Sequence, residues 1–540
     1  MRKKVNALIW FVTAGLILSC LFGANAISDD SLIIGLSELK VREETENAGG
    51  LDAQAYDAPM PVYAFVYDAL VEYGPYGMPL PGLAETWEIS PDGRVYTFHL
   101  RQGAKFSDGT PFNATAVKFS MERLKAKRSA GWMSMDDFTE IEIVDPYTIK
   151  FHYENSSYPT LQELMLCRPQ RIMSPNSVEP YGDPEGTFIK AIGTGPYKFQ
   201  EYVKDQEYVL VQNENYWGKK PNIEKLVFKL IPEETTRLMA LRAGEIDLIG
   251  SGLSTIHPGD VSDLEKNPDL SVITKEGDMA FYIIPNYEKE PYDDVLVRQA
   301  LNYAVNAEEI SNSLFGGIYK ETKGAFSPTM PYYHDSYEKG IVNGYSYDPA
   351  KARELLKEAG WADTDGDGIV DKDGKAFEAK LVVPSIMPWS GMGISNQRPL
   401  AEAIQAYLND VGIKVSIESV EGGAWWDKVT KTYEYDMYIY GPWGVIYDPP
   451  CTLRAYWYTG GRLKYSDPQF DQLLDEVVAS TDDAARQEIY DQIFTYMDEK
   501  ALVVPLYQDA KIFAMRSDVT GFEIPPTDYI FNLTEVEING

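Results

Sequence analysis

Residues 94–112, which read RVYTFHLRQGAKFSDGTPF, give the clearest local indication of the fold. The first half of this stretch alternates in polarity, as a strand with one buried face does. Turn signals lie on both sides of the strand, at Pro91-Asp-Gly93 and at Asp108-Gly109. A helix is expected directly afterwards, from Ala114 to Leu124, with Asn113 as its N-cap. The region is therefore predicted to mix strands and helices.

The second half of the chain predicts a regular α/β alternation. Proline at position 349 predicts the first turn of a helix that Gly360 closes. A short buried strand at 381–384, a helix at 399–411 and a strand at 413–419 then follow in order. Strand, helix and strand in succession indicate a parallel sheet. The predicted fold class is therefore α/β, with at least one parallel-sheet lobe.

Length and composition limit the class of protein. A chain of 540 residues exceeds what one hydrophobic core usually supports, so more than one domain is expected. Hydrophobic residues make up 44% and aromatic residues 13%, which is ample for packed cores. The net charge of −33 argues against a nucleic-acid partner, because binding to phosphates needs clustered Lys and Arg.

The N-terminus predicts export from the cytoplasm. Arg2 to Lys4 form a basic start, an apolar run follows to Leu18, and Ala24-Asn-Ala26 offers a cleavage site. Residues 1–26 are thus expected to be a signal peptide. Lipidation at Cys20 is the alternative, which would anchor the protein at the outer face of the cytoplasmic membrane.

No catalytic motif is present. The sequence contains no GxSxG, no GxxxxGK[ST] and no HExxH, and its four His residues are scattered. An enzyme is therefore not expected. Cys167 and Cys451, the cysteines that follow Ala26, could form a disulfide or remain two buried thiols.

One Asp-rich loop has the spacing of a calcium-binding loop. Asp363, Asp365, Asp367 and Asp371 could present several oxygens around one ion. The bidentate Glu expected at the twelfth loop position is replaced by Gly374. A polar turn without a metal is the alternative, since Asp and Gly form such turns readily.

Several segments in a fixed order resemble the family 5 extracellular solute-binding proteins. The matching segments are VYDALV (66–71), LAETW (83–87), SPDG (90–93), YTFHLRQGAKFSDGTPF (96–112), GTGP (193–196), NENYW (213–217) and RQALNYAV (298–305). Any single segment is a weak signal, but the shared order is specific. The resemblance extends from about residue 30 to the C-terminus.

The resemblance implies a two-lobed α/β fold of the periplasmic-binding-protein type, with a hinge and a ligand cleft between the lobes. Residues 27–284 would form lobe I with an inserted subdomain, 285–504 lobe II, and 505–540 the return to lobe I. The protein would be a monomer in the periplasm that passes a small ligand to the permease subunits of an ABC importer. No cofactor is required for this role.

Within the family, the chain is most similar to the nickel-binding members. Arg168 follows the stretch YPTLQELMLC (158–167) and would hold a carboxylate of a nickel chelator, unless it forms a structural salt bridge. The other residues that the resemblance assigns to ligand binding are Tyr56, Met60, Arg128, Trp132, Trp426, Trp443 and Tyr447. The metal-binding His of those members has no equivalent in 454–461, so a preformed Ni(II)-chelate is the predicted ligand.

A dipeptide or oligopeptide is the main alternative ligand. Peptide-binding members need an acidic residue for the α-amino group, commonly a few residues after the cleft Trp. Gly444, Val445 and Ile446 occupy that interval, which disfavours peptides. A surface adhesin or a chemoreceptor partner on the same scaffold is a further class that the sequence leaves open.

Overall fold

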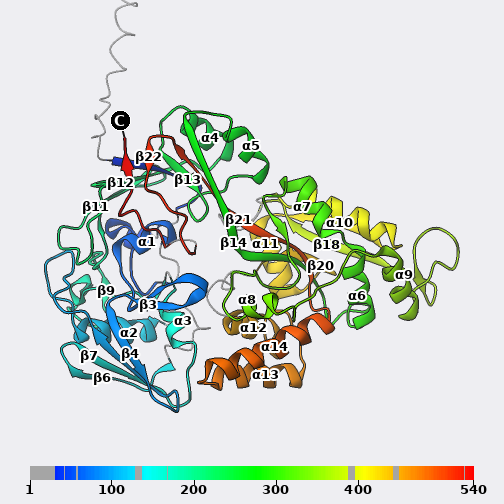
Figure 1. Cartoon of the computed structure of the whole chain (residues 1–540), viewed down its shortest axis with the longest axis horizontal. Helices are drawn as coiled ribbons and strands as arrows, with labels where there is room; N and C mark the ends of the chain where they lie inside the picture. The colour runs from blue at the N-terminus through cyan, green and yellow to red at the C-terminus, as the bar shows by residue number, and fades with distance from the viewer. Residues whose placement is uncertain are drawn as a thin grey trace, which may run out of the picture.

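The computed structural model shows two lobes connected by a pair of long strands (Figure 1). We call lobe I the part that holds the strands β1 to β13, and lobe II the part that holds the helices α6 to α14. The structure describes residues 31–39, 41, 43–55, 59–127, 137–166, 168–386, 396–441, 449–527 and 530–539. The predicted signal peptide and Cys20 lie outside these residues, as do Cys167 and the side chain of Cys451.

One mixed sheet runs through both lobes. From edge to edge its strands are β10 (Tyr197–Val203), β11 (Glu207–Gln212), β12 (Lys225–Leu230), β1 (Ser31–Leu36), β13 (Leu248–Gly250), β21 (Val504–Arg516), β14 (Leu270–Pro285), β20 (Met437–Tyr440), β18 (Glu378–Pro384) and β19 (Lys414–Val420). The short strand β15 (Lys320–Glu321) also pairs with β21. The order in the sheet differs widely from the order in the chain, so long-range pairings define this fold.

The helices of the structure lie in both lobes. They are α1 (Met60–Val66), α2 (Ala114–Lys127), α3 (Thr160–Leu164), α4 (Glu234–Arg242), α5 (Val261–Leu264), α6 (Val295–Ala304), α7 (Ala307–Phe315), α8 (Tyr333–Glu338), α9 (Pro349–Glu358), α10 (Arg398–Asp410), α11 (Gly422–Asp427), α12 (Pro449–Trp457), α13 (Pro468–Ala479) and α14 (Asp483–Glu499). Among the described residues, no helix has the length and apolar character that crossing a membrane requires.

Lobe I carries an antiparallel sheet of its own. Its strands are β4 (Ala84–Ile89), β5 (Val95–Leu100), β7 (Thr148–His152) and β6 (Glu140–Asp145), in that order. The alternation predicted for β5 is confirmed, because Tyr96, Phe98 and Leu100 are buried while their neighbours are partly exposed. The helix predicted after it is α2, and Asn113 Oδ1 accepts the N–H of Thr115 at 3.0 Å. Local capping and the buried strand face thus fix this subdomain.

Short two-stranded pairs complete the described strands. They are β2 (Val71–Tyr73) with β3 (Pro79–Pro81), β8 (Val178–Glu179) with β9 (Thr187–Phe188), β16 (Asp371–Lys372) with β17 (Lys375–Ala376), and β22 (Val519–Thr520) with β23 (Glu537–Ile538). The turn between β2 and β3 faces lobe II, because Gly77 in this turn lies against Pro331.

Lobe II confirms the predicted parallel sheet. Strands β18 and β19 pair in parallel, and α10 connects them. Helix α9 begins at Pro349 as expected, and Asp348 Oδ1 accepts the backbone N–H groups of Ala350 and Lys351. That capping satisfies two donors that the first turn would otherwise leave unpaired.

The strands β14 and β21 form the connection between the lobes. They pair antiparallel from Leu270 opposite Arg516 to Ile283 opposite Val504, with a register shift between Glu276 and Ala280. Before the shift, β21 lies between β14 and β13 of lobe I and pairs with both; after the shift, β14 pairs with β20 of lobe II. The predicted lobe boundaries at 284/285 and 504/505 fall at the lobe II end of these strands.

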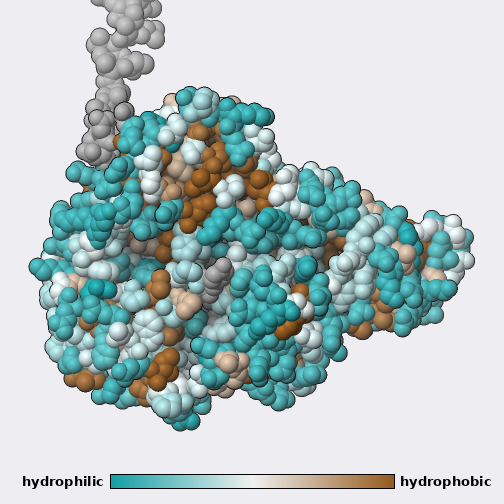
Figure 2. All heavy atoms as spheres, viewed as in Figure 1, coloured by the Kyte–Doolittle hydropathy of each residue, from teal (hydrophilic) through white to brown (hydrophobic). Residues whose placement is uncertain are grey.

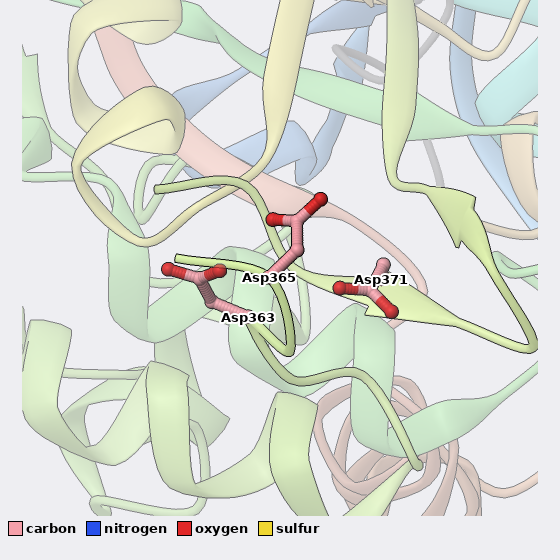
Figure 3. Close-up of side chains that lie close together, drawn as sticks. All are labelled: Asp363, Asp365 and Asp371. Atoms are coloured by element: carbon pink, nitrogen blue, oxygen red, sulfur yellow. The ribbon is translucent and has the colours of Figure 1, made fainter. Parts of the chain in front are cut away.

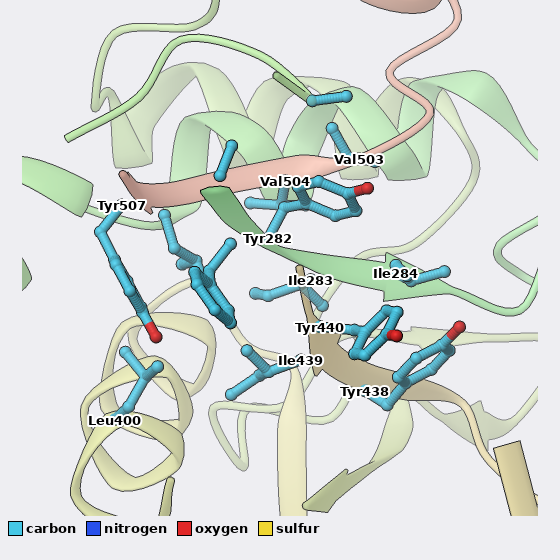
Figure 4. Close-up of a cluster of buried hydrophobic side chains, with 14 of the residues drawn as sticks. Tyr282, Ile283, Ile284, Leu400, Tyr438, Ile439, Tyr440, Val503, Val504 and Tyr507 are labelled. Carbon is cyan, nitrogen blue, oxygen red and sulfur yellow. The ribbon is translucent and has the colours of Figure 1, made fainter. Parts of the chain in front are cut away.

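The interior of lobe II continues onto the connecting strands. Figure 4 shows Ile283 of β14 beside Ile439 of β20, and Tyr282 of β14 beside Val504 of β21. All four are buried, and each such side chain contributes about 1.5–3 kcal/mol by leaving water. The face of the molecule that Figure 2 shows is mostly hydrophilic, in keeping with the net charge of −33, although a hydrophobic patch is visible in its upper part.

Candidate functional site

The candidate site lies where the two lobes face each other. In Figure 1, α3 and the neighbouring turns of lobe I point toward lobe II, and α11 lies on the side of lobe II nearest lobe I. The structure describes three of the predicted ligand residues. Met60 and Arg168 belong to lobe I and Trp426 to lobe II, so a ligand that contacted all three would touch both lobes.

Arg168 begins a segment that the fold of lobe I holds firmly. Three residues later, Arg171 is 2% exposed and its Nη1 donates to the carbonyl of Tyr67 at 3.0 Å. The same nitrogen lies 3.5 Å from Glu72. Burial raises the pKa of Glu72, and the charge of Arg171 offsets part of this increase. Gln54 also donates to the carbonyl of Arg171 at 2.7 Å. Arg171 is thus part of the interior, whereas Arg168 is only half-buried.

Met60 is the first residue of α1 and is half-buried. Pro59 precedes it, and Pro61 follows within the first turn, where a missing N–H has no cost. The next turns of α1 bury Tyr63 and Phe65 in lobe I. Helix α1 therefore fixes the backbone at Met60 while it leaves part of the side chain accessible.

Two adjacent tryptophans of α11 have different surroundings. Trp425 is fully buried, and its Nε1 donates to the carbonyl of Val382 at 3.3 Å. Trp426 is half-buried, and its ring centroid lies 5.6 Å from that of Tyr440. The guanidinium of Arg462 lies 5.8 Å from the Trp426 ring. Trp425 therefore belongs to the core, and Trp426 is the tryptophan of this pair that has surface to offer a ligand.

The remaining predicted ligand residues lie outside the described part of the chain, so their roles stay predictions. They are Tyr56, Arg128, Trp132, Trp443 and Tyr447.

A pocket of about 960 Å³ lies between the lobes. Its lobe I wall is largely apolar and includes Met78, Trp87, Ile89 and Leu161. Its lobe II wall is mainly polar, with the acidic residues Asp335, Asp483, Glu488 and Asp491 and the basic residues Lys339 and Arg486. Met60, Arg168 and Trp426 are not part of its described lining. No sequence pattern indicates this pocket, because its lobe I wall ends at Gln162 and its lobe II wall begins only at Pro331.

Side chains from both lobes meet in the lining of this pocket. The hydroxyl of Tyr158 lies 2.6 Å from that of Tyr332, and the guanidinium carbon of Arg486 lies 3.1 Å from the centre of the Tyr158 ring. Arg486 Nη1 also donates to the Tyr332 hydroxyl at 2.9 Å. Sequence reasoning missed these residues, although the 37 Tyr residues of the chain pointed to polar aromatic contacts in general.

The Asp-rich loop connects α9 to β16 in lobe II, and Figure 3 shows its side chains Asp363, Asp365 and Asp371. One carboxylate oxygen each from Asp363, Asp365 and Asp371 can lie within 4.8 Å of the others. Asp367 is not a member of this group. Asp371 accepts the N–H of Thr364 at 2.9 Å, which lowers its pKa. Calcium binding stays a prediction, because exposed acidic turns without a metal have the same arrangement.

The four His residues do not share a site. His99 lies 3.9 Å from Glu88, and His152 Nε2 lies 3.0 Å from Glu142. His257 Nδ1 accepts the N–H of Gly259, and His334 Nδ1 lies 2.9 Å from the carbonyl of Pro328. Among the described residues, the group of potential metal ligands with metal-binding spacing consists of Asp363, Asp365 and Asp371, and it contains no His. The described lobes thus offer no imidazole cluster for a bare transition-metal ion.

Comparison with known proteins gives the family. The model of the bacterial extracellular solute-binding proteins, family 5 Middle, matches residues 79–464. The nickel-binding periplasmic protein of Escherichia coli K12 is 31% identical over 471 residues, which cover 85% of this chain and 87% of that protein. The dipeptide-binding protein of the same organism is also 31% identical, over 475 residues that cover 83% of this chain and 84% of that protein.

A solved structure has the same two-lobed architecture. NikA from Brucella suis, in complex with Fe(III)-EDTA, superposes with a TM-score of 0.84 at 29% identity and covers 94% of this chain and 99% of its own. The predicted α/β two-lobed fold is thereby confirmed. Members of this family bind solutes for ABC importers and work with membrane permease subunits; they are not enzymes. The chain belongs to the family 5 bacterial extracellular solute-binding proteins.

Proposed function

We propose that this protein captures a nickel chelate outside the cytoplasmic membrane and delivers it to an ABC importer. The observation that supports this most is the placement of Arg168, a half-buried arginine at the start of a firmly held segment next to α3. A guanidinium presents two parallel donors to a carboxylate, which is the group that a metal chelator exposes.

The scattered histidines favour a chelate over a bare ion. Ni²⁺ prefers nitrogen ligands of the imidazole type, and the four His residues each have a separate local partner. A chelator that supplies most of the metal ligands removes the need for such residues. The structural relative from Brucella suis carries a metal in that form, as Fe(III)-EDTA.

A dipeptide or oligopeptide is the second candidate ligand. It is supported by the dipeptide-binding protein of Escherichia coli, whose 31% identity equals that of the nickel-binding protein. The interval 444–446, where peptide binding would need an acidic residue, lies outside the described residues and contains Gly, Val and Ile. The nickel chelate is therefore the ligand that we favour.

The remaining features of the proposal concern the cellular context. We propose that residues 1–26 direct export, with lipid attachment at Cys20 as the alternative, and that the protein acts as a monomer. We also propose that residues 27–284 form lobe I, 285–504 lobe II, and 505–540 the return to lobe I. On binding, the ligand would contact both lobes and shift the population toward the closed conformation.

Calorimetric titration of the metal-stripped mature protein tests the ligand. Three probes are compared: Ni²⁺ alone, Ni²⁺ with excess free histidine, and a dipeptide mixture. Tight binding of the nickel–histidine complex alone is expected. Arg168→Ala should then weaken binding about 10- to 100-fold, the range for a hydrogen bond to a charged group.

Arg242→Ala is the matched control for this titration. Arg242 lies on α4 and pairs with Asp263 at 2.7 Å on the surface, so its loss should leave the affinity unchanged. Tight dipeptide binding with no response to the nickel complex would show that the protein is a peptide receptor.

A further inference from the structure

The two lobes are held together at a second place, remote from the connecting strands. Tyr158 precedes α3 of lobe I, Tyr332 precedes α8 of lobe II, and Arg486 lies in α14. The Tyr158 and Tyr332 hydroxyls are 2.6 Å apart, and the Arg486 guanidinium lies 3.1 Å from the Tyr158 ring centre. A hydrogen bond and a cation–π contact thus cross between the lobes.

Each partner is positioned by its own lobe. Gln162 Nε2 donates to the Tyr158 hydroxyl at 3.1 Å from the next turn of α3. On the other side, the Tyr332 ring stacks on Tyr490 at 4.7 Å. Arg486 is 2% exposed, and its Nη2 donates to the carbonyl of Ser480 at 2.6 Å. The three groups are therefore already oriented before the lobes approach, which lowers the entropy cost of the contact.

The backbone at Tyr332 is also unusual. Its φ of 61° and ψ of −41° are rare for a residue with a side chain. The surrounding contacts must maintain this conformation, and they direct the Tyr332 hydroxyl toward lobe I. Such a conformation is expected at a residue that is positioned for a specific contact.

Close approach of the two surfaces supports the same assignment. Gly77, in the turn between β2 and β3, faces Pro331 so closely that a Cβ at this glycine would lie 2.3 Å from the proline Cγ. At Gly93, a Cβ would lie 2.7 Å from Cγ2 of Thr481, at the start of the α14 region. Glycines at both turns of lobe I allow the lobes to touch on either side of the tyrosine pair.

We infer that Tyr158, Tyr332 and Arg486 form an interlobe latch, which stabilises the closed conformation independently of the ligand contacts. The latch lies outside the predicted ligand residues, so it acts on affinity by changing the population of the closed state. It does not depend on whether the ligand is a nickel chelate or a peptide.

Hydroxyl removal tests the latch. Tyr158→Phe and Tyr332→Phe keep the rings and delete the interlobe hydrogen bond. With whichever of Ni²⁺, nickel–histidine or dipeptide binds the wild type, each variant should raise Kd about fivefold, the equivalent of one hydrogen bond. The double variant should raise Kd no further than the single ones, because both changes remove the same contact.

Tyr345→Phe is the matched control, since the Tyr345 hydroxyl donates to the carbonyl of Asp498 at 2.6 Å entirely within lobe II. This variant should leave Kd unchanged. Additive effects of the two latch changes, or Kd values equal to that of the control, would overturn the latch.

Hydrogen exchange provides a second measurement that needs no ligand. Tyr332→Phe changes lobe II, yet the amides of residues 157–164 in lobe I should exchange faster in this variant than in the wild type or in Tyr345→Phe. Unchanged exchange there in the ligand-free protein would also refute the inference. If none of the three probes binds, the proposed ligand is wrong, and this exchange measurement alone decides about the latch.

Discussion

The lobes meet in two ways that differ in kind. At the connecting strands, residues Met279 to Ile284 of β14 are all buried, and Phe281 stacks on Tyr507 of β21 at 4.8 Å. At the latch, one hydroxyl pair and one cation–π contact carry the interaction. The first contact is a hydrophobic interior that unfolding alone can expose. The second is a small set of polar contacts that can form and break while both lobes stay folded.

This difference assigns the two contacts different tasks. Burial of the apolar side chains at the strands contributes far more free energy than one hydrogen bond does. This connection therefore persists in the open and closed states. The latch contributes an amount comparable with thermal energy and can therefore adjust the balance between those states. Changes at the strands should affect unfolding, and changes at the latch should affect closure.

The largest effect on unfolding is expected at the ion pair of the connecting strands. Lys511 Nζ lies 2.6 Å from Asp278 Oδ2, and both side chains are largely buried. Burial raises the pKa of Asp278 and Lys511 opposes this shift. Lys511→Met leaves a buried carboxylate without its counter-charge, so the free energy of unfolding should fall by about 3–5 kcal/mol in chemical denaturation.

Lys320→Met is the control for this change. Lys320 pairs with Glu276 at 2.7 Å close to the same strands, but both side chains are exposed. Its loss should alter the free energy of unfolding by about 0–1 kcal/mol. Equal effects of the two substitutions would contradict the distinction between the buried connection and the surface.

A smaller effect is expected within lobe II, on the helix that carries Arg486. Burial raises the pKa of Asp498 at the end of α14 to about 6, although it accepts N–H groups from Asn343 and Gly344. The folded state then binds a proton more readily than the unfolded state, so its stability falls as the pH rises from about 4 to about 6.

Asp498→Asn removes this cost and keeps an acceptor. The variant should be more stable than the wild type by about 1–3 kcal/mol at pH 7.5, with the difference disappearing near pH 4. Thermal unfolding at a series of pH values measures this. An equal or lower stability at pH 7.5 would show that the Asp498 carboxylate is not destabilising.

At the latch, the effect on unfolding should be smaller still. Tyr158→Phe should lower the free energy of unfolding by about 1 kcal/mol or less, because one hydroxyl contact is lost and both lobes keep their interiors. Chemical denaturation next to Lys511→Met compares the two directly. A loss as large as that of Lys511→Met would mean that the latch is part of the folded core.

The smallest effect is expected at the Asp-rich loop. If the loop binds calcium, about 1 mM Ca²⁺ should stabilise the protein by about 1 kcal/mol or less, without any change in ligand affinity. Asp365→Asn should abolish this stabilisation in thermal unfolding. An equal response of wild type and variant would place calcium elsewhere or show a general salt effect.

Local features of the fold were predictable from sequence, and long-range ones were not. The capping of α9 by Asp348 and the turn signals around β5 depend on residues close in the chain, so both elements were predicted correctly. The order of strands in the main sheet depends on pairings such as Leu270 with Arg516, for which no local signal exists.

The candidate site shows the same limit. The resemblance to the family directed attention to Arg168 and Trp426, and the structure leaves both partly accessible. The latch joins residues 158, 332 and 486, which come together only in the folded chain. At Asp367 the sequence pattern predicted too much. Its regular spacing suggests a fourth calcium ligand, but Asp367 does not belong to the cluster formed by Asp363, Asp365 and Asp371.

Small-angle X-ray scattering of the metal-stripped mature protein tests the central claim most directly. The scattering is recorded without ligand, with the nickel–histidine complex and with a dipeptide mixture. The account predicts that the radius of gyration falls only with nickel–histidine, because this ligand bridges the lobes and closes them. A fall with dipeptides and none with the nickel complex would contradict the proposed function.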